Sequence, residues 1–220
     1  MLVTTATPFV SRALKSACGL VAVCLLIACG SASTAAEAAV QPGDLPSGLQ
    51  KCDVSGAIDS FLNAIQTRDP KTYATDSSEW AVAKQDGAIA AEVVLYSVST
   101  AACDAIHNAT GSGDIASPKS PLVVSVAIQF KDEASAAMAY ASESIWGLSK
   151  SSIVKSGAAG LTQGDGTGLG TNSIALPVVL GGQQLFVAIW QNKAFLLLLL
   201  VVNVAHAQSK NIATNENGRI

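Results

Sequence analysis

Few side chains in this sequence could carry out catalysis. Nucleophilic catalysis needs a base within hydrogen-bonding reach of the nucleophile, and the histidines are only His107 and His206. Neither lies beside a recognisable nucleophilic serine, and the motif Gly-x-Ser-x-Gly is absent after residue 28. The acidic residues are scattered, so no carboxylate pair suggests glycoside hydrolysis. We therefore expect both histidines on helix surfaces, no catalytic residues and no cofactor in a domain that is not an enzyme.

The glycine-rich stretch from Gly164 to Gly170 could suggest a phosphate-binding loop. It lacks the Lys-Ser/Thr pair of a P-loop, and its glycine spacing does not match Gly-x-Gly-x-x-Gly. It also precedes a predicted strand, whereas phosphate loops precede a helix whose N-terminus meets the anion. We interpret residues 157–170 as a surface loop, with a ligand lid as the alternative and its role left open.

The N-terminus has the pattern of a secretory signal peptide. Residues 1–16 contain two cations, Arg12 and Lys15, and no acid. A small and apolar run from Ala17 to Ala28 follows, which is shorter than the roughly 20 residues of a transmembrane helix. A basic flank, a short apolar core and small residues at its end are typical of an exported protein.

The end of this run resembles the lipobox of bacterial lipoproteins. The sequence Leu26-Ile27-Ala28-Cys29 has an aliphatic residue, two small or aliphatic residues and then cysteine. The resemblance implies a diacylglyceryl group on Cys29, cleavage just before it and a further acyl chain on the new amine, which together anchor the protein stably. An ordinary signal peptide or an uncleaved anchor is the alternative. Because Gly30 follows the cysteine, the resemblance allows sorting to the outer membrane as well as to the cell membrane. In either case we expect the domain on the extracytoplasmic face.

Two further cysteines, Cys52 and Cys103, remain after cleavage. Cysteines of exported proteins tend to pair, so we predict a disulfide between them. Buried free thiols are one alternative. A metal site made of these cysteines with Asp104 and His107 is the other, and we expect no metal.

Composition excludes some partners. Removing residues 1–28 takes away two cations and no acid, so the net charge falls from −3 to −5. An acidic surface without a Lys/Arg cluster argues against nucleic acid. Aromatic residues make up 5% of the chain, so we expect Trp80, Trp146 and Trp190 in the core or at its rim rather than as a stacking platform for sugars.

Periodicity predicts the helices. Small residues with Pro and Gly indicate a flexible tether over residues 29–50. Apolar residues then recur with helical spacing from Val54 to Ile65, after a cap at Asp53. Three further helices are predicted after capping signals: residues 76–87 after Asp76, residues 99–110 after Ser99 and residues 132–148 after Asp132. A last helix is predicted over residues 206–217, starting at His206.

Alternation and continuous apolar runs predict the strands. The clearest alternates between Leu122 and Phe130. A run from Ala194 to Val202 fits a central strand covered on both faces. The other strands are predicted at residues 90–98, 152–156, 172–180 and 183–190, with a helix over residues 80–96 as the alternative to the first.

These elements predict an α+β fold with an antiparallel or mixed sheet, a C-terminal three-stranded meander and helices packed on it. The predicted organisation is a signal peptide (1–28), a tether (29–50) and a single domain (51–220). We expect a membrane-anchored domain that binds a protein partner or small ligand without catalysis. A carrier of a hydrophobic ligand, held in a pocket between helices and sheet, is the first alternative, and an envelope enzyme is the second.

Overall fold

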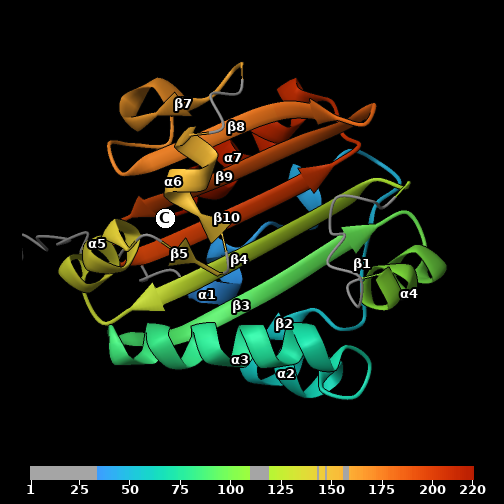
Figure 1. Ribbon diagram of the computed structural model, residues 1–220, viewed down its shortest axis with the longest axis horizontal. Coiled ribbons are helices and arrows are strands. Elements are labelled where there is room, and N and C mark those ends of the chain that lie inside the picture. Colours follow the sequence, from blue (N-terminus) through green and yellow to red (C-terminus); the bar gives the residue numbers. More distant parts are fainter. Residues whose placement is uncertain (1–33, 110–118, 143, 147, 156–158) are drawn as a thin grey trace, which may run out of the picture. The chain divides into compact units, whose positions relative to one another are not determined.

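The computed structural model describes residues 34–109, 119–142, 144–146, 148–155 and 159–220 (Figure 1). The helices are α1 (Ala35–Ala38), α2 (Ile58–Ile65), α3 (Pro70–Gln85), α4 (Thr100–Ala109), α5 (Glu133–Ala141), α6 (Lys150–Lys155) and α7 (His206–Gly218), with 3-10 turns η1 (Pro42–Asp44) and η3 (Gly164–Thr167). The strands are β1 (Gln50–Lys51), β2 (Gly56–Ala57), β3 (Ala88–Ser97), β4 (Leu122–Phe130), β5 (Ser144–Ile145), β6 (Leu148–Ser149), β7 (Thr162–Gln163), β8 (Ser173–Leu180), β9 (Gln183–Asn192) and β10 (Phe195–Val202).

Within the described residues, eight strands form one antiparallel sheet. Its order is β1-β3-β4-β10-β9-β8-β7, and β2 also pairs with β3. Strands β8, β9 and β10 are neighbours in both sequence and space, which confirms the predicted C-terminal meander. Strands β5 and β6 form a separate hairpin. The predicted α+β class is therefore confirmed, with a purely antiparallel main sheet.

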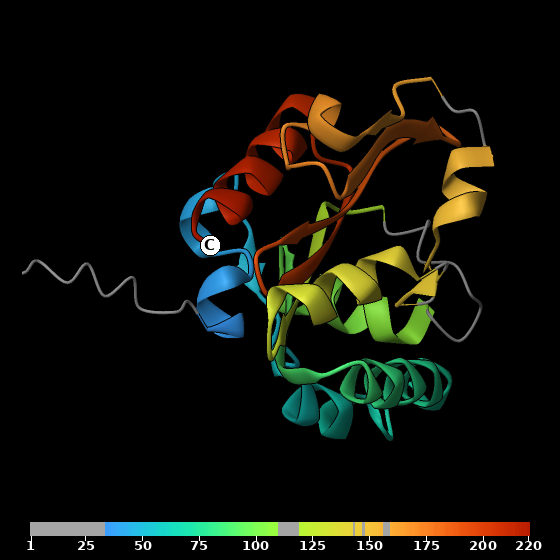
Figure 2. The same ribbon diagram turned by 90° about the vertical axis from the view of Figure 1, so that its left-hand side faces the viewer.

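The sheet is buried on both faces. Along β10, Leu196 and Leu198 pack into one apolar core and Leu197 and Leu199 pack into the other. Figure 2 shows α1 and α7 on one side of the sheet, whereas the helices from α2 to α6 lie on the opposite side. The prediction of a central strand covered on both faces is confirmed, and β10 sits between its long partners β4 and β9.

The N-terminal segment belongs to the domain from Thr34 onward. The Thr34 side chain and Glu37 form a capping box at the start of α1, and Ala38, Ala39 and Val40 have no exposed surface. The prediction of a flexible tether over residues 29–50 is therefore wrong from Thr34 onward. Short alanine side chains bury little area alone, but they let the segment lie close against the sheet. Residues before Thr34 lie outside the described ranges.

The first predicted helix begins later than expected. α2 starts at Ile58 rather than after Asp53, because residues 50–57 pair with β3 through β1 and β2. The Cys52 amide also donates to the Leu95 carbonyl of β3 at 2.8 Å. Pairing with a long neighbouring strand thus overrides the helical apolar pattern of this segment.

The second helix begins earlier than expected, at Pro70. The Asp69 carboxylate accepts a hydrogen bond from the Thr72 amide at 3.1 Å, and Pro70 occupies the first turn, where its missing N–H costs nothing. The predicted start at Asp76 is therefore inside α3. The following segment is strand β3, so the alternative helix over residues 80–96 is wrong beyond Gln85.

Three later boundaries test the sequence analysis further. The Ser99 hydroxyl accepts from the Ala102 amide at 3.1 Å and caps α4, as predicted. α5 starts after its predicted cap Asp132 but ends at Ala141, before the β5–β6 hairpin. The strand expected at residues 152–156 is wrong, because residues 150–155 form α6.

Candidate ligand-binding pocket

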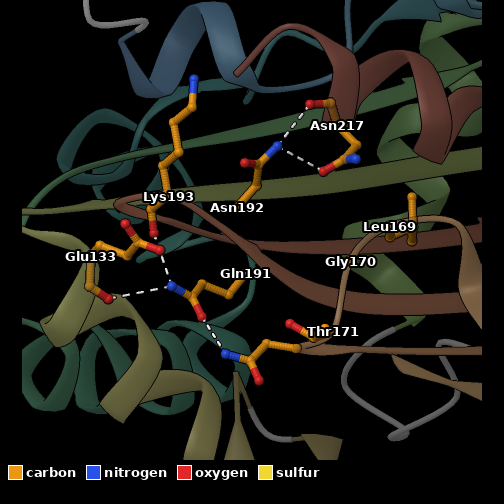
Figure 3. A pocket seen from close by; sticks show the side chains of 9 residues that line it. Glu133, Leu169, Gly170, Thr171, Gln191, Asn192, Lys193 and Asn217 are labelled. Carbon is orange, nitrogen blue, oxygen red and sulfur yellow. Dashed lines mark hydrogen bonds between the residues drawn. The ribbon is translucent and has the colours of Figure 1, made fainter. Parts of the chain in front are cut away.

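A polar pocket of about 290 Å³ lies where β9 turns into β10 (Figure 3). Four segments meet there: the first turn of α5, the loop before β8, the β9–β10 turn and the last turn of α7. They contribute Glu133, residues 169–172, residues 191–193 and Asn217, respectively. Side-chain amides dominate this lining, and the apolar Leu169 is almost completely buried.

Gln191 holds three walls of the pocket together. Its side-chain oxygen Oε1 accepts a hydrogen bond from the Asn172 side chain at 2.5 Å. Its Nε2 donates to the backbone oxygens of Lys193 at 3.0 Å and Glu133 at 3.3 Å. The Gln191 amide group therefore fixes the loop before β8 and the start of α5 against the β9–β10 turn.

Asn192 links the same turn to α7. Its Nδ2 donates to the backbone oxygen of Asn217 at 2.9 Å and to the Asn217 side-chain oxygen at 2.8 Å. Next to it, Lys193 adopts a left-handed conformation with φ of 49°, and its ammonium group donates to the Ile220 carbonyl oxygen. The lysine charge is thus directed at the C-terminal residue.

Several polar groups of the lining have no partner among the described residues. The carboxamide oxygens of Asn172 and Asn192 accept no hydrogen bond there, and neither does the Glu133 carboxylate. The Thr171 hydroxyl and the Asn217 Nδ2 remain as donors. The pocket therefore presents both acceptors and donors to a ligand, with more acceptors than donors.

Buried hydroxyls fix the glycine-rich loop that forms one wall. The hydroxyls of Thr167 and Ser173 share a hydrogen bond of 2.6 Å, and each lies 2.9 Å from the Gly164 carbonyl oxygen. The Leu169 amide donates to the Thr167 hydroxyl at 2.9 Å. Gly170 follows with φ of 112°, a conformation that favours glycine. Residues 164–170 of the predicted loop are therefore held in place, and Leu169 and Gly170 line the pocket.

Comparisons with known proteins give no relative. No family model, curated protein or solved structure matches this chain. The function must therefore be inferred from the geometry of the chain itself. Within the described residues, no helix is long and apolar enough to cross a membrane.

A second group of interest is a pair of buried carboxyls, one at the N-cap of α3 and one within it. Asp69 and Asp76 are seven residues apart, which places them on one face of the helix, and both are almost completely buried. Burial is the largest cause that raises the pKa of Asp76 to about 7; the nearby Asp69 and Glu79 contribute to the rise, and a hydrogen bond with Trp146 opposes it. The sequence analysis missed this pair, since it placed the start of the helix at Asp76, whereas α3 is capped by Asp69 and includes Asp76.

A third buried carboxyl, Glu216 of α7, has no exposed surface. Its Oε1 accepts a hydrogen bond from the Ser125 hydroxyl at 2.6 Å, and the Val40 amide donates to that hydroxyl at 3.4 Å. Burial raises the pKa of Glu216 to about 8, although Ser125 and Arg219 lower it. The carboxyl is therefore neutral at pH 7, and it joins α7 and β4 to the N-terminal segment.

The predicted disulfide is present. Cys52 and Cys103 are bonded, with Cα atoms 5.6 Å apart. The bond removes both thiolates from the alternative metal site, and no group of three or more potential metal ligands occurs among the described residues. The predicted lipidation site, Cys29, lies outside those residues.

His206 and the three tryptophans are not part of the pocket lining. His206 starts α7 and is half-buried, and its Nε2 has no partner in the described part of the chain. The side chain of His107 lies outside that part. Trp80 and Trp190 are buried in the two cores, and Trp146 packs at the edge of one of them.

The sequence analysis missed the pocket residues. Asn172, Gln191, Asn192 and Asn217 come from three segments that are distant in sequence, and asparagine and glutamine near turns are common. The one available signal was their recurrence at strand and helix ends. It becomes informative only when β8, β9 and α7 are known to meet.

Proposed function

We propose that this protein is a membrane-anchored, extracytoplasmic binding domain whose site is the polar pocket at the β9–β10 turn. The observation that carries the proposal is the set of unpartnered acceptors and donors in a pocket whose other amides hold the walls in place. Such preorganised polar groups fix the orientation of a ligand at little entropic cost.

The lining favours a small, uncharged ligand rich in hydroxyl groups, such as a sugar ring. A hydroxyl group both donates and accepts, which matches the mixture of groups at Asn172, Asn192 and Asn217. The volume of about 290 Å³ is near the low end for small-molecule sites. No aromatic residue is in the lining, so we expect a millimolar dissociation constant for a single free sugar.

Binding without catalysis fits the chemistry of the lining. Four of the lining side chains are amides, which do not ionise near pH 7 and are not nucleophiles, and no histidine or cysteine is in the lining. Of the two ionisable lining residues, Glu133 is exposed and the ammonium group of Lys193 donates to Ile220. A carrier of hydrophobic ligands would need an apolar cavity, whereas this lining is polar. Both faces of the sheet are also filled by side chains.

An enzyme is the second candidate, and one observation favours it. The pKa of Asp76, raised to about 7, suits a general acid or base. Asp76 belongs to α3, however, and none of the segments lining the pocket includes it. Its effect on folding is therefore the simpler interpretation.

The anchor is proposed from the resemblance to a lipobox at Leu26-Ile27-Ala28-Cys29. The Cys52–Cys103 disulfide supports export, because disulfides persist in oxidising compartments. The partners proposed here are thus the membrane, through lipid on Cys29, and a small ligand. The location is the extracytoplasmic face of the cell membrane or outer membrane.

The anchor is tested by growing cells with labelled palmitate. We expect label in the wild-type protein and none in Cys29→Ala, which should accumulate unprocessed or be released. Cys52→Ala serves as the matched control and should keep the label. Label that persists in Cys29→Ala would rule out lipidation at this residue.

The pocket is tested by NMR on the mature, lipidated chain in detergent micelles. Methyl glucoside, methyl galactoside, methyl mannoside and N-acetylglucosamine are titrated to about 100 mM, a range suited to millimolar binding. We expect saturable shifts of the side-chain amide signals of Asn192 and Asn217 with at least one of them.

Two variants control the titration. Thr171→Arg places a long side chain at the exposed rim and should abolish the shifts. Gln208→Arg adds the same side chain to an exposed position of α7, nine residues before Asn217 and so about 14 Å away along the helix, and should leave them unchanged. If no sugar gives a saturable shift, or Thr171→Arg does not remove it, the proposed site is wrong.

A further inference from the structure

The pocket lies beside the segment that leads to the proposed anchor. Asn217 is part of the lining, and Arg219 follows two residues later. The Arg219 guanidinium donates to the carbonyl oxygens of Glu37, Ala38 and Ala39 at the end of α1. Figure 2 shows the C-terminus of the chain beside α1.

Several strong interactions hold the end of α7 against the N-terminal segment. Arg219 also forms a salt bridge of 2.7 Å with Asp44 of η1, in which both side chains are largely buried. The Tyr96 hydroxyl donates to the Val40 carbonyl at 3.1 Å, and Glu216 supports the same segment through Ser125. The N-terminal segment therefore cannot separate from the last turn of α7 without breaking buried polar contacts.

The linker between Cys29 and Thr34 is only five residue steps long. A fully extended chain covers at most about 3.6 Å per residue, so this linker spans no more than about 18 Å. The sequence analysis predicted a tether of 22 residues, and the folding of residues 34–50 onto the sheet removes most of it. A lipid on Cys29 would thus keep α1 and the adjoining pocket close to the headgroup layer.

The charges around the pocket disfavour an anionic headgroup. The Lys193 ammonium is directed at Ile220, and the Arg219 guanidinium is occupied by Asp44 and the carbonyls of α1. The exposed Glu133 carboxylate and the net charge of −5 after cleavage add repulsion.

We propose that the pocket binds the uncharged, hydroxyl-rich headgroup of a lipid in the same membrane that carries the anchor. This inference rests on the proposed function, because it takes both the pocket and the Cys29 anchor as given. It adds the source of the ligand. Sharing one surface raises the effective concentration of the headgroup to the millimolar range or above, which compensates for the weak affinity expected of a pocket without aromatic residues.

The test uses the mature, lipidated protein in vesicles of phosphatidylcholine and phosphatidylglycerol, with or without monoglucosyldiacylglycerol. Hydrogen–deuterium exchange is measured for peptides covering residues 170–173 and 191–194. We expect exchange to slow about tenfold when the glycolipid is in the same vesicle. The same total amount of glycolipid in separate vesicles, or of soluble methyl glucoside, should have little effect.

Two changes separate the lipid inference from the proposed function. Thr171→Arg should abolish the protection, and Gln208→Arg should not. Inserting a 20-residue Gly/Ser spacer between Gly30 and Ser31 lets the domain move well away from the bilayer. We expect the spacer to reduce the protection by glycolipid and to leave the millimolar affinity for a soluble sugar unchanged.

The possible outcomes distinguish the two proposals. If soluble sugar binds but glycolipid in the same vesicle gives no protection, or the spacer has no effect on it, the lipid inference is wrong and the proposed function stands. If no soluble sugar gives a saturable NMR shift and glycolipid in the same vesicle gives no protection, both proposals are wrong. Protection that depends on glycolipid, Thr171 and the short linker supports both.

Discussion

Glu216 places an uncharged carboxyl group in the interior of the sheet and helix packing. A buried charge there would be very unfavourable, and the structure avoids it by keeping the proton, as the raised pKa of about 8 shows. Asp76 is a second example, with a pKa of about 7. Both groups bind a proton more tightly in the folded state than in the unfolded chain, so stability depends on pH.

The first prediction concerns this pH dependence. Below about pH 4.5, Glu216 is protonated in both states, and its contribution to stability is fully present. As pH rises toward 8, only the folded state keeps the proton, so the free energy of unfolding falls by up to about 1.4 kcal/mol per pH unit. Glu216→Gln should remove this slope between pH 7 and 8, as measured by urea unfolding at each pH.

Asp76→Asn is the matched control. Because the pKa of Asp76 is about 7, its contribution is lost mainly as pH rises from about 4 to 7. The variant should therefore flatten the lower range and keep the slope between pH 7 and 8. A Glu216→Gln variant with the full wild-type slope in that upper range would show that Glu216 does not hold the proton.

At the scale of elements, residues 92–97 of β3 are supported by the short strands β1 and β2. The segment before α2 and the first turn of α4 are tied together by the Cys52–Cys103 bond, across 51 residues of sequence. This covalent link joins parts of the chain whose pairing with β3 is short, since β1 and β2 contribute two residues each.

The second prediction is that the disulfide contributes substantially to stability. Closing a loop of this length should stabilise the folded state by about 4 kcal/mol in the chain-entropy model. The double variant Cys52→Ser/Cys103→Ser should lose that amount in denaturant unfolding under oxidising conditions. With reducing agent present, wild type and variant should become similar. Equal stability without reducing agent would contradict the prediction.

The third prediction concerns β10, which has one apolar core on each face. Leu197→Lys and Leu198→Lys place a charge in opposite cores, and each should cost about 3 kcal/mol or more. Val179→Lys, at a position that is 59% exposed, is the control and should change the melting temperature little. A β10 variant that keeps the parental melting temperature would show that its face of the sheet is accessible to water.

At the scale of the whole domain, the two ends of the described chain are fastened together. Arg219 near the C-terminus contacts α1 and η1 through four acceptor groups. The N-terminal segment thereby completes the layer that α7 forms on its face of the sheet. A force or tether applied at Thr34 would act directly on the end of α7 and on the pocket.

The fourth prediction tests this connection. Arg219→Ala should remove charge-assisted hydrogen bonds worth more than 1 kcal/mol in total. Amide exchange at Ala38 and Ala39 should become at least about tenfold faster, as measured by NMR. Arg68→Ala removes an exposed pair with Asp53 and should not change it. Unaltered exchange in Arg219→Ala would show that the segment is held by apolar packing alone.

The sequence by itself determined the class of fold, the long strands, the C-terminal meander and the disulfide pair. Alternation from Leu122 to Phe130 and the apolar run of β10 are local patterns that a strand satisfies in any context, so they predict correctly. Only two cysteines remain after the proposed cleavage besides Cys29, which left one intramolecular pair. The lipobox is likewise a local motif, and its lipidation remains a prediction.

Only the tertiary structure decided the start of the domain, the helix boundaries and the pocket. Ala38 and Val40 fold because a sheet face is available to them, and α2 starts late because β3 pairs with the preceding residues. The pocket arises where Asn172, Gln191 and Asn217 converge from separate elements. Burial, pairing and convergence depend on contacts between residues far apart in sequence, and local patterns carry no information about them.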